Sequence, residues 1–363
     1  MDEYLEYVSQ VVTALHRYAA VRVVMGNESC DLDSCISALV YAYLLHSEVE
    51  PSTAVIPLLN ILQRELPVRT EVTYFLRKNG IPLDRLVFRD TIELKGLLES
   101  GQLELTLVDH HVLSSETQGL RGAVVEVVDH HPQDPAWHWT EQNVILTTVG
   151  SCATLVANQV LTRRPHLLDA QVAALLYGPI VLDTACFSAA AERTTELDLQ
   201  VVAQLEARGA GSQKWEELFS ELLAARSDVS ALSPGQLLLK DMKVASGIPV
   251  PGLPILVREF LTRPNVMEAL KEFCAEMQTN IVVVMGLHIE GGVIQRDIAV
   301  FHVAAPEAAH KLVECLKSST DPVLQLEDVS NLIPGLQLFK QLNVKASRKQ
   351  VLPVVRECVV SKQ

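Results

Sequence analysis

The stretch VRVVMGNESCDLDS, residues 21–34, joins an apolar run to a polar turn that carries Asp31 and Asp33. Three later apolar runs also end on an acidic residue: LTLV before Asp109, VEVV before Asp129 and GPIVL before Asp183. Ligands of open α/β sheets bind outside the carboxyl ends of the parallel strands, so strands of this kind would gather their acidic ends at one edge. The sequence therefore predicts an α/β fold with a cluster of functional side chains at that edge.

The composition is that of a globular protein with a large core. The 363 residues are 48% hydrophobic and 20% charged, which is ordinary for a chain of two domains. A formal net charge of −14 argues against a nucleic-acid-binding surface, for which a basic face is expected. The acidic start is unlike a signal peptide, and no apolar stretch approaches the length of a membrane span. We expect a protein of the cytosol, with the nucleus as a second compartment.

The seven cysteines are scattered along the chain without C-x-x-C or finger-like spacing. This pattern predicts neither a disulfide framework nor a structural zinc site.

Apolar and helix-like segments alternate in the first half of the chain, which is typical of a parallel sheet with covering helices. The expected strands are 22–26, 53–59, 85–89, 103–109, 124–129 and 143–148. The expected helices are 34–46, 91–99 and 150–163, and the apolar run 169–182 is compatible with either a helix or a buried strand.

The texture changes near Ser233-Pro234-Gly235, a helix start signal, and a smaller α+β domain is expected beyond it. Residues 194–226 read as two helices broken by a turn at 209–212. In the second domain, residues 244–250, 253–257, 280–290 and 296–303 read as strands, and 264–278 and 306–317 as helices. We predict domains at 1–210 and 236–363, joined by a helical linker at 211–235.

The acid–histidine set favours a metal site. A lone Asp at the end of a strand is usually a helix cap or a turn former. Two V-D-H-H runs that each follow an apolar strand are harder to explain in this way, because they hold four of the eleven histidines. Carboxylate-rich sites with one or two imidazoles suit Mn²⁺, Mg²⁺ or Co²⁺ better than zinc. Two ions about 3.5–4 Å apart would allow phosphoryl transfer, with a metal-bound hydroxide as the nucleophile.

These motifs resemble those of the DHH phosphoesterase superfamily, in their order along the chain. The residues that carry the resemblance are G-N-E-x-C-D-L-D-S at 26–34, the two V-D-H-H runs, the late L-D at 182–183, the turn at 150–154 and S-R-K at 347–349. The last of these is similar to the signature of the C-terminal domain in family II inorganic pyrophosphatases and exopolyphosphatases. Within that branch the first motif resembles the animal exopolyphosphatases most. The resemblance implies an N-terminal DHH domain, a DHH-associated C-terminal domain that binds substrate, and an active site in the cleft between them.

The resemblance also implies roles for particular residues. One metal would be held by Asn27, Asp31 and Asp109, and the other by Asp33, Asp109, His130 and Asp183, with Asp129 orienting the histidines. The residues implied to contact phosphate oxygens are His131, Lys240, Arg348 and Lys349, and those implied in catalysis are Asp109, His131, Arg348 and Lys349. The pyrophosphatases have a His at the position of Asn27, so the first metal is expected to be held differently here.

Four positions near these motifs keep open interpretations. His110 and His111 follow the second motif, where pyrophosphatases typically read D-H-N, and a buried, hydrogen-bonded ring is the plainest reading of His111. Trp137 and Trp139 follow the third motif, and they fit either a lid on the substrate side or ordinary loop packing.

The function implied is the hydrolysis of short-chain inorganic polyphosphate, with pyrophosphate as a second substrate and Mn²⁺ or Mg²⁺ as cofactor. Two alternatives stay open. One is a phosphodiesterase that acts on cyclic nucleotides. The other is a weakly active scaffold that binds partners such as nucleoside diphosphate kinase or cytoskeletal regulators.

Overall fold

The computed structural model describes residues 1–139, 143–329 and 333–360, which divide into two compact units, 1–226 and 227–363. The boundary falls inside the predicted linker, 211–235. Helix α8, Trp215–Ser227, lies almost wholly in the first unit, whereas α9, Pro234–Lys240, belongs to the second.

The first unit is built on a five-stranded parallel sheet in the order β2-β1-β3-β4-β5. The strands are β1 Ala20–Met25, β2 Thr53–Leu58, β3 Leu103–Val108, β4 Val124–Asp129 and β5 Val144–Leu146. Consecutive residues of β1 and β2 are buried although their side chains alternate between the two faces, so both faces of the sheet are covered. The predicted α/β class is confirmed.

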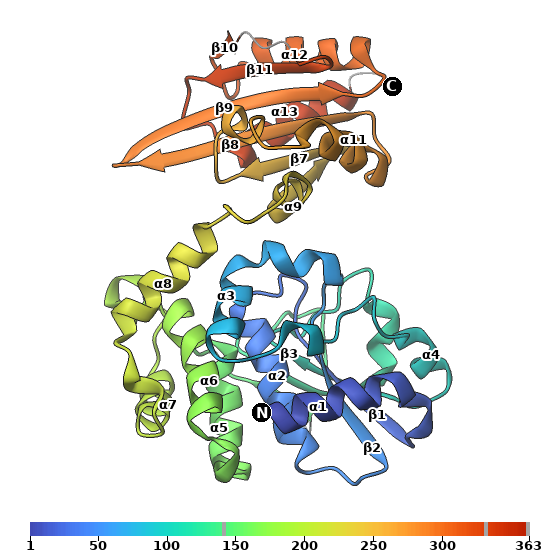
Figure 1. Cartoon of the computed structure of the whole chain (residues 1–363), viewed down its shortest axis with the longest axis vertical. Helices are drawn as coiled ribbons and strands as arrows, with labels where there is room; N and C mark the ends of the chain where they lie inside the picture. The colour runs from blue at the N-terminus through green and yellow to red at the C-terminus, as the bar shows by residue number, and fades with distance from the viewer. Residues whose placement is uncertain (140–142, 330–332, 361–363) are drawn as a thin grey trace. The chain divides into compact units, whose positions relative to one another are not determined.

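Helices surround this sheet (Figure 1). They are α1 Asp2–Val11, α2 Leu32–His46, α3 Thr70–Lys78, α4 Leu94–Glu99, α5 Cys152–Arg163, α6 Ala170–Asp183 and α7 Glu196–Glu206, followed by α8. Helix α2 packs on β2 and against α5 and α6, and nearly all of its residues are buried. The ambiguous run 169–182 is therefore helical, and it forms the buried helix α6.

The second unit holds a six-stranded mixed sheet in the order β10-β11-β9-β8-β7-β6. Its strands are β6 Met242–Ala245, β7 Ile248–Leu253, β8 Ile281–Glu290, β9 Val293–His302, β10 Leu326–Val329 and β11 Leu336–Gln341. Its further helices are α10 Val257–Phe260, α11 Val266–Glu276, α12 Pro306–Ser318 and α13 Arg348–Val360. Side chains of β8 alternate between two cores, with Val282 and Val284 in one and Val283 and Met285 in the other. The α+β prediction for this domain is confirmed.

Three predicted strands were wrong. Residues 85–89 hold the end of a 3-10 turn and a single bridge between Phe88 and Leu59, because the apolar run is too short to pair along its length. Residues 253–257 contain the end of β7 and the start of α10, since Pro254 has no N–H to continue a ladder. Residues 244–250 form a hairpin instead of one strand, because Ser246 and Gly247 both adopt positive φ, 49° and 81°.

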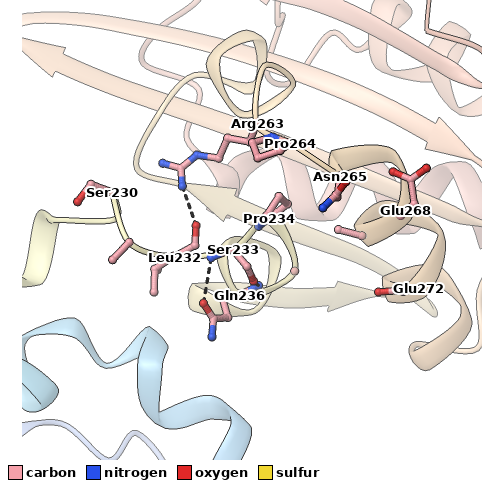
Figure 2. Close-up of a pocket in the computed structure, with 13 residues that line it drawn as sticks. Ser230, Leu232, Ser233, Pro234, Gln236, Arg263, Pro264, Asn265, Glu268 and Glu272 are labelled. Carbon is pink, nitrogen blue, oxygen red and sulfur yellow. Dashed lines mark hydrogen bonds between the residues drawn. The ribbon is translucent and has the colours of Figure 1, made fainter.

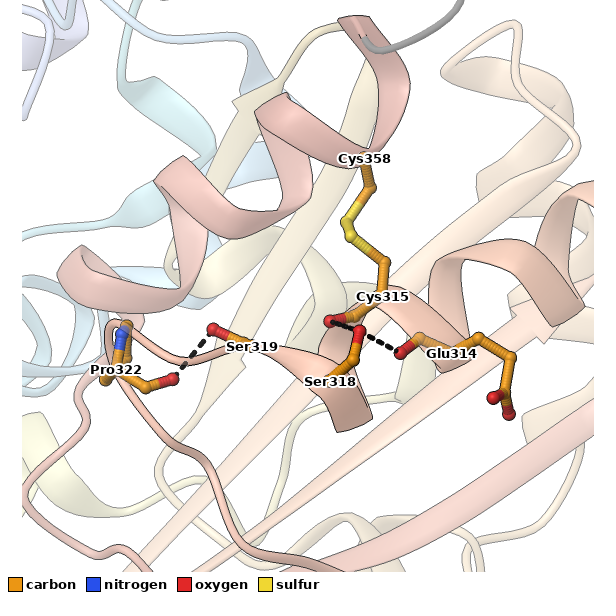
Figure 3. Close-up of a disulfide and its surroundings, with 6 residues drawn as sticks. All are labelled: Glu314, Cys315, Ser318, Ser319, Pro322 and Cys358. Carbon is orange, nitrogen blue, oxygen red and sulfur yellow. Dashed lines mark hydrogen bonds between the residues drawn. A yellow bond between two sulfur atoms is a disulfide. The ribbon is translucent and has the colours of Figure 1, made fainter.

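The expectation of no disulfide was also wrong. Cys315 of α12 and Cys358 of α13 are joined, with 6.1 Å between their Cα atoms (Figure 3). The two residues are 43 positions apart in sequence, and only the packing of α12 against α13 brings them together. The other five cysteines are free.

The described residues include no helix of the length and apolar character needed to cross a membrane.

Candidate metal centre

The first motif forms a tight turn between β1 and α2. A side chain at Gly26 would come within 2.3 Å of Ser34 Oγ, so this close approach needs glycine. Ser34 Oγ accepts a hydrogen bond from the Asn27 backbone N–H at 2.6 Å. Asp31 caps α2 by accepting from the Ser34 N–H at 3.1 Å. The turn thus fixes the two acidic residues of the motif at the start of a buried helix.

Asn27 connects the first motif to the second. Its amide Nδ2 donates to Asp109 Oδ2 at 2.8 Å, and its Oδ1 accepts from the backbone N–H groups of Ser29 at 3.0 Å and Cys30 at 3.2 Å. In this arrangement Asn27 holds Asp109 in place.

Asp33 connects the first motif to the start of α5. Its two carboxylate oxygens accept from the Cys152 N–H at 2.6 Å and the Ala153 N–H at 2.8 Å. These are orphan donors of a helix N-terminus, which favours a negative charge. Asp33 is buried, and burial raises the pKa of its carboxyl even though the charge of His130 and the two N–H groups lower it.

Asp109 and His130 face each other at the centre of the pocket. Asp109 is buried with a φ of 61°, a conformation that Asp tolerates better than most residues. His130 Nε2 lies 3.3 Å from Asp109 Oδ1 and 3.7 Å from Asp33 Oδ2. His130 Nδ1 lies 2.9 Å from the carbonyl oxygen of Val149 and must carry a proton to donate to it, so in the neutral ring the lone pair is on Nε2 and faces the carboxylates. This is the tautomer required of a metal-ligating histidine.

Asp129 is surrounded by donors. Its Oδ1 accepts from His131 Nδ1 at 2.8 Å and from the His130 N–H at 2.7 Å, and its Oδ2 accepts from His111 Nδ1 at 2.5 Å. Burial alone would raise the pKa of Asp129, but the hydrogen bonds from His131 and His111 outweigh it and lower the pKa to about 2. The hydrogen bond that His131 donates to Asp129 also raises the pKa of His131. The carboxylate is therefore occupied in orienting histidines.

Asp183 reaches the pocket from a helix and not from a strand. It is the last residue of α6, and its Oδ2 is buried without a hydrogen-bond partner among the described residues. Burial, followed by the charges of Asp33 and Asp31, raises the pKa of Asp183 well above its ordinary value. Burial raises the pKa of Asp109 in the same way, with the charges of Asp33 and Asp31 adding to it.

These side chains line one pocket of about 500 Å³ at the carboxyl ends of β1, β3 and β4. The predicted site residues on its wall are Asn27, Asp31, Asp33, Asp109, His130, His131 and Asp183. Ligand atoms of Asp109, Asp129, His130 and His131 all lie within 4.8 Å of one another, close enough to surround one ion. The remaining three predicted residues, Lys240, Arg348 and Lys349, belong to the second unit. There Arg348 Nη2 pairs with Asp241 Oδ1 at 2.5 Å.

Sequence reasoning missed the segment that follows Asp183. The pocket is also lined by Glu192, Arg193, Thr194 and Thr195, and Arg193 is the only Lys or Arg on its wall within the part of the chain that the structure describes. Only the polar run A-E-R-T-T at 191–195, soon after the fourth motif, signals this segment in the sequence.

Asp198 was missed as well. It is fully buried and accepts from the Gly150 N–H at 2.9 Å and Thr154 Oγ1 at 2.6 Å, so it fixes the turn after β5 from α7.

The residues present fit divalent cations. Three carboxylates with raised pKa values, Asp33, Asp109 and Asp183, line one pocket together with the His130 imidazole, and one oxygen of Asp183 has no hydrogen-bond partner among the described residues. Like charges held this close need a compensating cation. Oxygen-rich sets with one imidazole suit Mn²⁺ or Mg²⁺.

A larger pocket, about 890 Å³, lies in the second unit beside α9 and α11 (Figure 2). Arg263, the one Lys or Arg among the described residues that line it, already donates to the carbonyl oxygen of Leu232 at 2.7 Å. Its acidic residues, Glu268 and Glu272, are exposed on α11. The chemistry therefore favours the smaller pocket as the functional site.

Comparison with known proteins gives the same picture. The model of the DHH family N-terminal domain matches residues 22–180, and that of the DHHA2 domain matches residues 220–358. Exopolyphosphatase PRUNE1 of Homo sapiens is 37% identical to the chain, over 98% of the chain and 79% of that protein. Its counterpart in Bos taurus is 38% identical, over 97% of the chain and 79% of that protein. A manganese-dependent inorganic pyrophosphatase of Methanocaldococcus jannaschii is 28% identical, over 61% of the chain and 66% of that protein.

Proposed function

The chain belongs to the DHH family, in the branch that carries a DHHA2 domain, and on this premise we propose that it is a metal-dependent hydrolase of phosphoanhydride bonds. Short-chain inorganic polyphosphate is the proposed substrate, and pyrophosphate is the second. Relatives named exopolyphosphatase and manganese-dependent inorganic pyrophosphatase support this substrate class.

The observation that carries the proposal is the group of carboxylates around His130. Asp33, Asp109 and Asp183 have raised pKa values in the protein alone, and one oxygen of Asp183 is buried and unpaired. A polyanionic substrate would be repelled by such a site unless cations bound there first. Bound Mn²⁺ or Mg²⁺ would supply that charge, polarise the phosphoryl oxygens and activate a water molecule.

We propose that two ions are held as expected from the sequence. Asp33, Asp109, His130 and Asp183 would hold one, supported by the distances of His130 Nε2 to Asp109 and Asp33. Asp31 and Asp109 would hold the other. Asn27 was expected to be a third ligand of this second ion. Its hydrogen bonds support a different role, in which Asn27 positions Asp109.

Once cations have neutralised the carboxylates, side chains that donate hydrogen bonds would bind the phosphate chain. Asp129 accepts from His131 Nδ1 and raises the pKa of the ring, and the protonated ring would donate from Nε2 to a phosphate oxygen. Arg193 is a second candidate within the first unit. Lys240, Arg348 and Lys349 of the second unit remain proposed phosphate ligands, because Lys and Arg are the usual partners of phosphate oxygens.

Phosphate release tests the proposal. Protein treated with a chelator and then supplied with Mg²⁺ or Mn²⁺ should release phosphate from tripolyphosphate, tetraphosphate and pyrophosphate. Asp109→Asn should be inactive with either metal although it keeps the fold. Hydrolysis of cyclic AMP without release of phosphate from polyphosphate would favour the phosphodiesterase alternative. Inactivity on every substrate, with Mg²⁺ and with Mn²⁺, in protein that binds the metal would favour the scaffold alternative. Cytosolic or nuclear location and partners such as nucleoside diphosphate kinase remain predictions.

A further inference from the structure

His111 bridges the metal centre and the loop that follows the third motif. The ring is buried, with 4% of its surface exposed, and both of its nitrogens are engaged. The Asp134 backbone N–H donates to His111 Nε2 at 2.8 Å, so Nε2 holds a lone pair and the proton resides on Nδ1. His111 Nδ1 therefore donates to Asp129 Oδ2, at 2.5 Å. The ring acts as a rigid spacer between a loop and a carboxylate.

The loop is fastened to His111 at a second point. Trp139 Nε1 donates to the His111 carbonyl oxygen at 2.9 Å. The guanidinium carbon of Arg121 lies 4.7 Å from the centre of the Trp137 ring and 5.5 Å from that of Trp139. The tryptophan pair thus packs on the protein around His111, which favours loop packing over a free lid.

Asp129 transmits the position of His111 to the site. One of its oxygens is held by His111, and the other is held by His131 and by the backbone of the third motif. A buried carboxylate that loses a donor on one side reorients or draws in water, because an unpaired buried oxygen is unfavourable. His131 takes its ring orientation from the same carboxylate.

We propose that His111 is a positioning residue, which takes its orientation from the 132–139 loop and sets that of Asp129 and, through it, of His131. This inference rests on the proposed function for its effect on phosphate-bearing substrates. The linkage itself is a property of the fold, and it is testable without turnover.

Two substitutions of His111 test its two ring hydrogen bonds separately. In His111→Asn the amide Nδ2 can replace Nδ1–H as the donor to Asp129, but the acceptor for Asp134 is lost. In His111→Gln the amide oxygen can reach the place of Nε2 and accept from Asp134, but the donor to Asp129 is lost. Trp215→Phe in both variants and in the reference protein leaves Trp137 and Trp139 as the only tryptophans, because the chain has three.

Three measurements on the full chain test the linkage. The first is tryptophan emission, which reports on the loop, and the second is the ¹⁵N shifts of the His131 ring, which report on its bond to Asp129. The third is kcat and KM on tripolyphosphate with Mn²⁺. His111→Asn should shift the emission to longer wavelength and keep the His131 signals. His111→Gln should keep the emission, change the His131 signals and lower kcat/KM about tenfold, the lower end of the usual effect of an outer ligand partner.

Two results would overturn the proposal: emission unchanged in His111→Asn, or His131 signals unchanged in His111→Gln. The failure of the proposed function has a different signature, because the reference protein would then release no phosphate whatever the emission and the ¹⁵N shifts showed. If His111→Gln folds poorly, the His111→Asn emission still decides whether the loop is fastened through the ring.

Discussion

Asn27 Nδ2 donates to Asp109 Oδ2 at 2.8 Å across the point where the strand order of the sheet reverses. Asn27 follows β1 and Asp109 follows β3, and the chain winds outward in opposite directions from these two neighbouring strands. Ligand sites of doubly wound sheets lie at such a switch point. The hydrogen bond is therefore placed where it fixes a carboxylate at the mouth of the site.

Asn27→Asp should destabilise the metal-free protein more than the metal-bound one. The new carboxylate keeps the acceptor for Ser29 and Cys30, but it replaces the donor to Asp109 with a like charge. We expect a loss of about 1–3 kcal/mol in the free energy of unfolding with a chelator present, and a smaller loss with Mn²⁺, which attracts both carboxylates. Asn27→Ala is the control, because it removes the acceptor and the donor together without adding a charge. Equal losses of Asn27→Asp in the two conditions would contradict the role assigned to this hydrogen bond.

Asp109→Asn should stabilise the protein in the presence of a chelator, and the gain in stability should grow as the pH rises. Burial, with the charges of Asp33 and Asp31, raises the pKa of Asp109 well above its ordinary value of 3.8. A raised carboxyl pKa gives stability that is complete below the unfolded pKa and is lost as pH rises through the folded pKa. The Asn side chain removes this penalty and suits the φ of 61°. Melting temperatures of the two proteins with chelator should therefore diverge progressively as the pH rises above the ordinary carboxyl pKa of 3.8.

Added Mn²⁺ should reverse that order, because the cation binds the ionised carboxylate. At pH 8 the protein with Asp109 should then melt above Asp109→Asn, by an amount that grows with metal concentration, about 2.7 kcal/mol at one hundred times Kd. A melting temperature insensitive to Mn²⁺ in both proteins would argue against a metal site at Asp109.

Much of the site was predictable because its residues lie next to strands. The apolar runs that end on Asp109 and Asp129 form β3 and β4, and the parallel pairing of these strands places their carboxyl ends side by side. The order of the motifs predicted the DHH resemblance, which the family models and relatives confirm. The element that carries Asp183 could not be predicted, because an apolar run buried on all sides has the same sequence pattern in a helix as in a strand.

Other features depend on contacts that no local pattern records. The Cys315–Cys358 bond follows from the packing of two helices in the second unit. Arg193 reaches the pocket from a turn that has no regular period, and Asp198 is a helical residue whose partners lie 44 and 48 positions away. Long-range packing decides these positions, and a single sequence does not record it.

Arg193→Ala should weaken the binding of phosphate-bearing substrates. Among the described residues, Arg193 is the one Lys or Arg side chain on the pocket wall, and the contact recorded for it there is 3.5 Å long, to the Asp183 carbonyl oxygen, so it is available to a ligand. A charge-assisted hydrogen bond contributes about 1.5–3 kcal/mol, and KM for tripolyphosphate should rise about tenfold or more. Arg193→Lys should recover part of this loss because the charge remains. An unchanged KM in Arg193→Ala would show that the phosphates lie elsewhere in the pocket.

Cys315→Ser should lower the stability of the second unit. Removing a cross-link between residues 43 positions apart increases the entropy of the unfolded chain, and the chain-entropy estimate is about 4 kcal/mol as an upper value. Chemical unfolding of the reference protein should show this loss on addition of dithiothreitol, whereas Cys315→Ser should not respond. Cys274→Ala, at a buried free cysteine, controls for the loss of a thiol and should keep the response to reductant. A reference protein indifferent to reductant would mean that the bond does not form in solution.

Gly178→Ala should disturb the site from inside the core. Gly178 lies in α6, five residues before Asp183, and a Cβ there would come within 2.2 Å of the Phe75 ring on α3. Overpacking of this kind costs about 1–3 kcal/mol, and any shift of α6 moves Asp183 with it. We expect a lower free energy of unfolding together with weaker Mn²⁺ binding, measured by calorimetry. Gly96→Ala in α4 is the matched control, because its nearest neighbour is 3.8 Å away and the change should stabilise by about 0.4–1 kcal/mol.

A substitution of Phe75 tests whether Gly178→Ala acts through contact with the Phe75 ring. Phe75→Leu removes the atoms that a new Cβ would meet, so the double variant with Gly178→Ala should lose less stability than the sum of the two single changes. It should also recover part of the Mn²⁺ affinity, since α6 can return toward its position. Additive losses would show that the alanine acts through something other than contact with Phe75. Normal metal binding in a destabilised Gly178→Ala would show that Asp183 does not depend on the packing of its own helix.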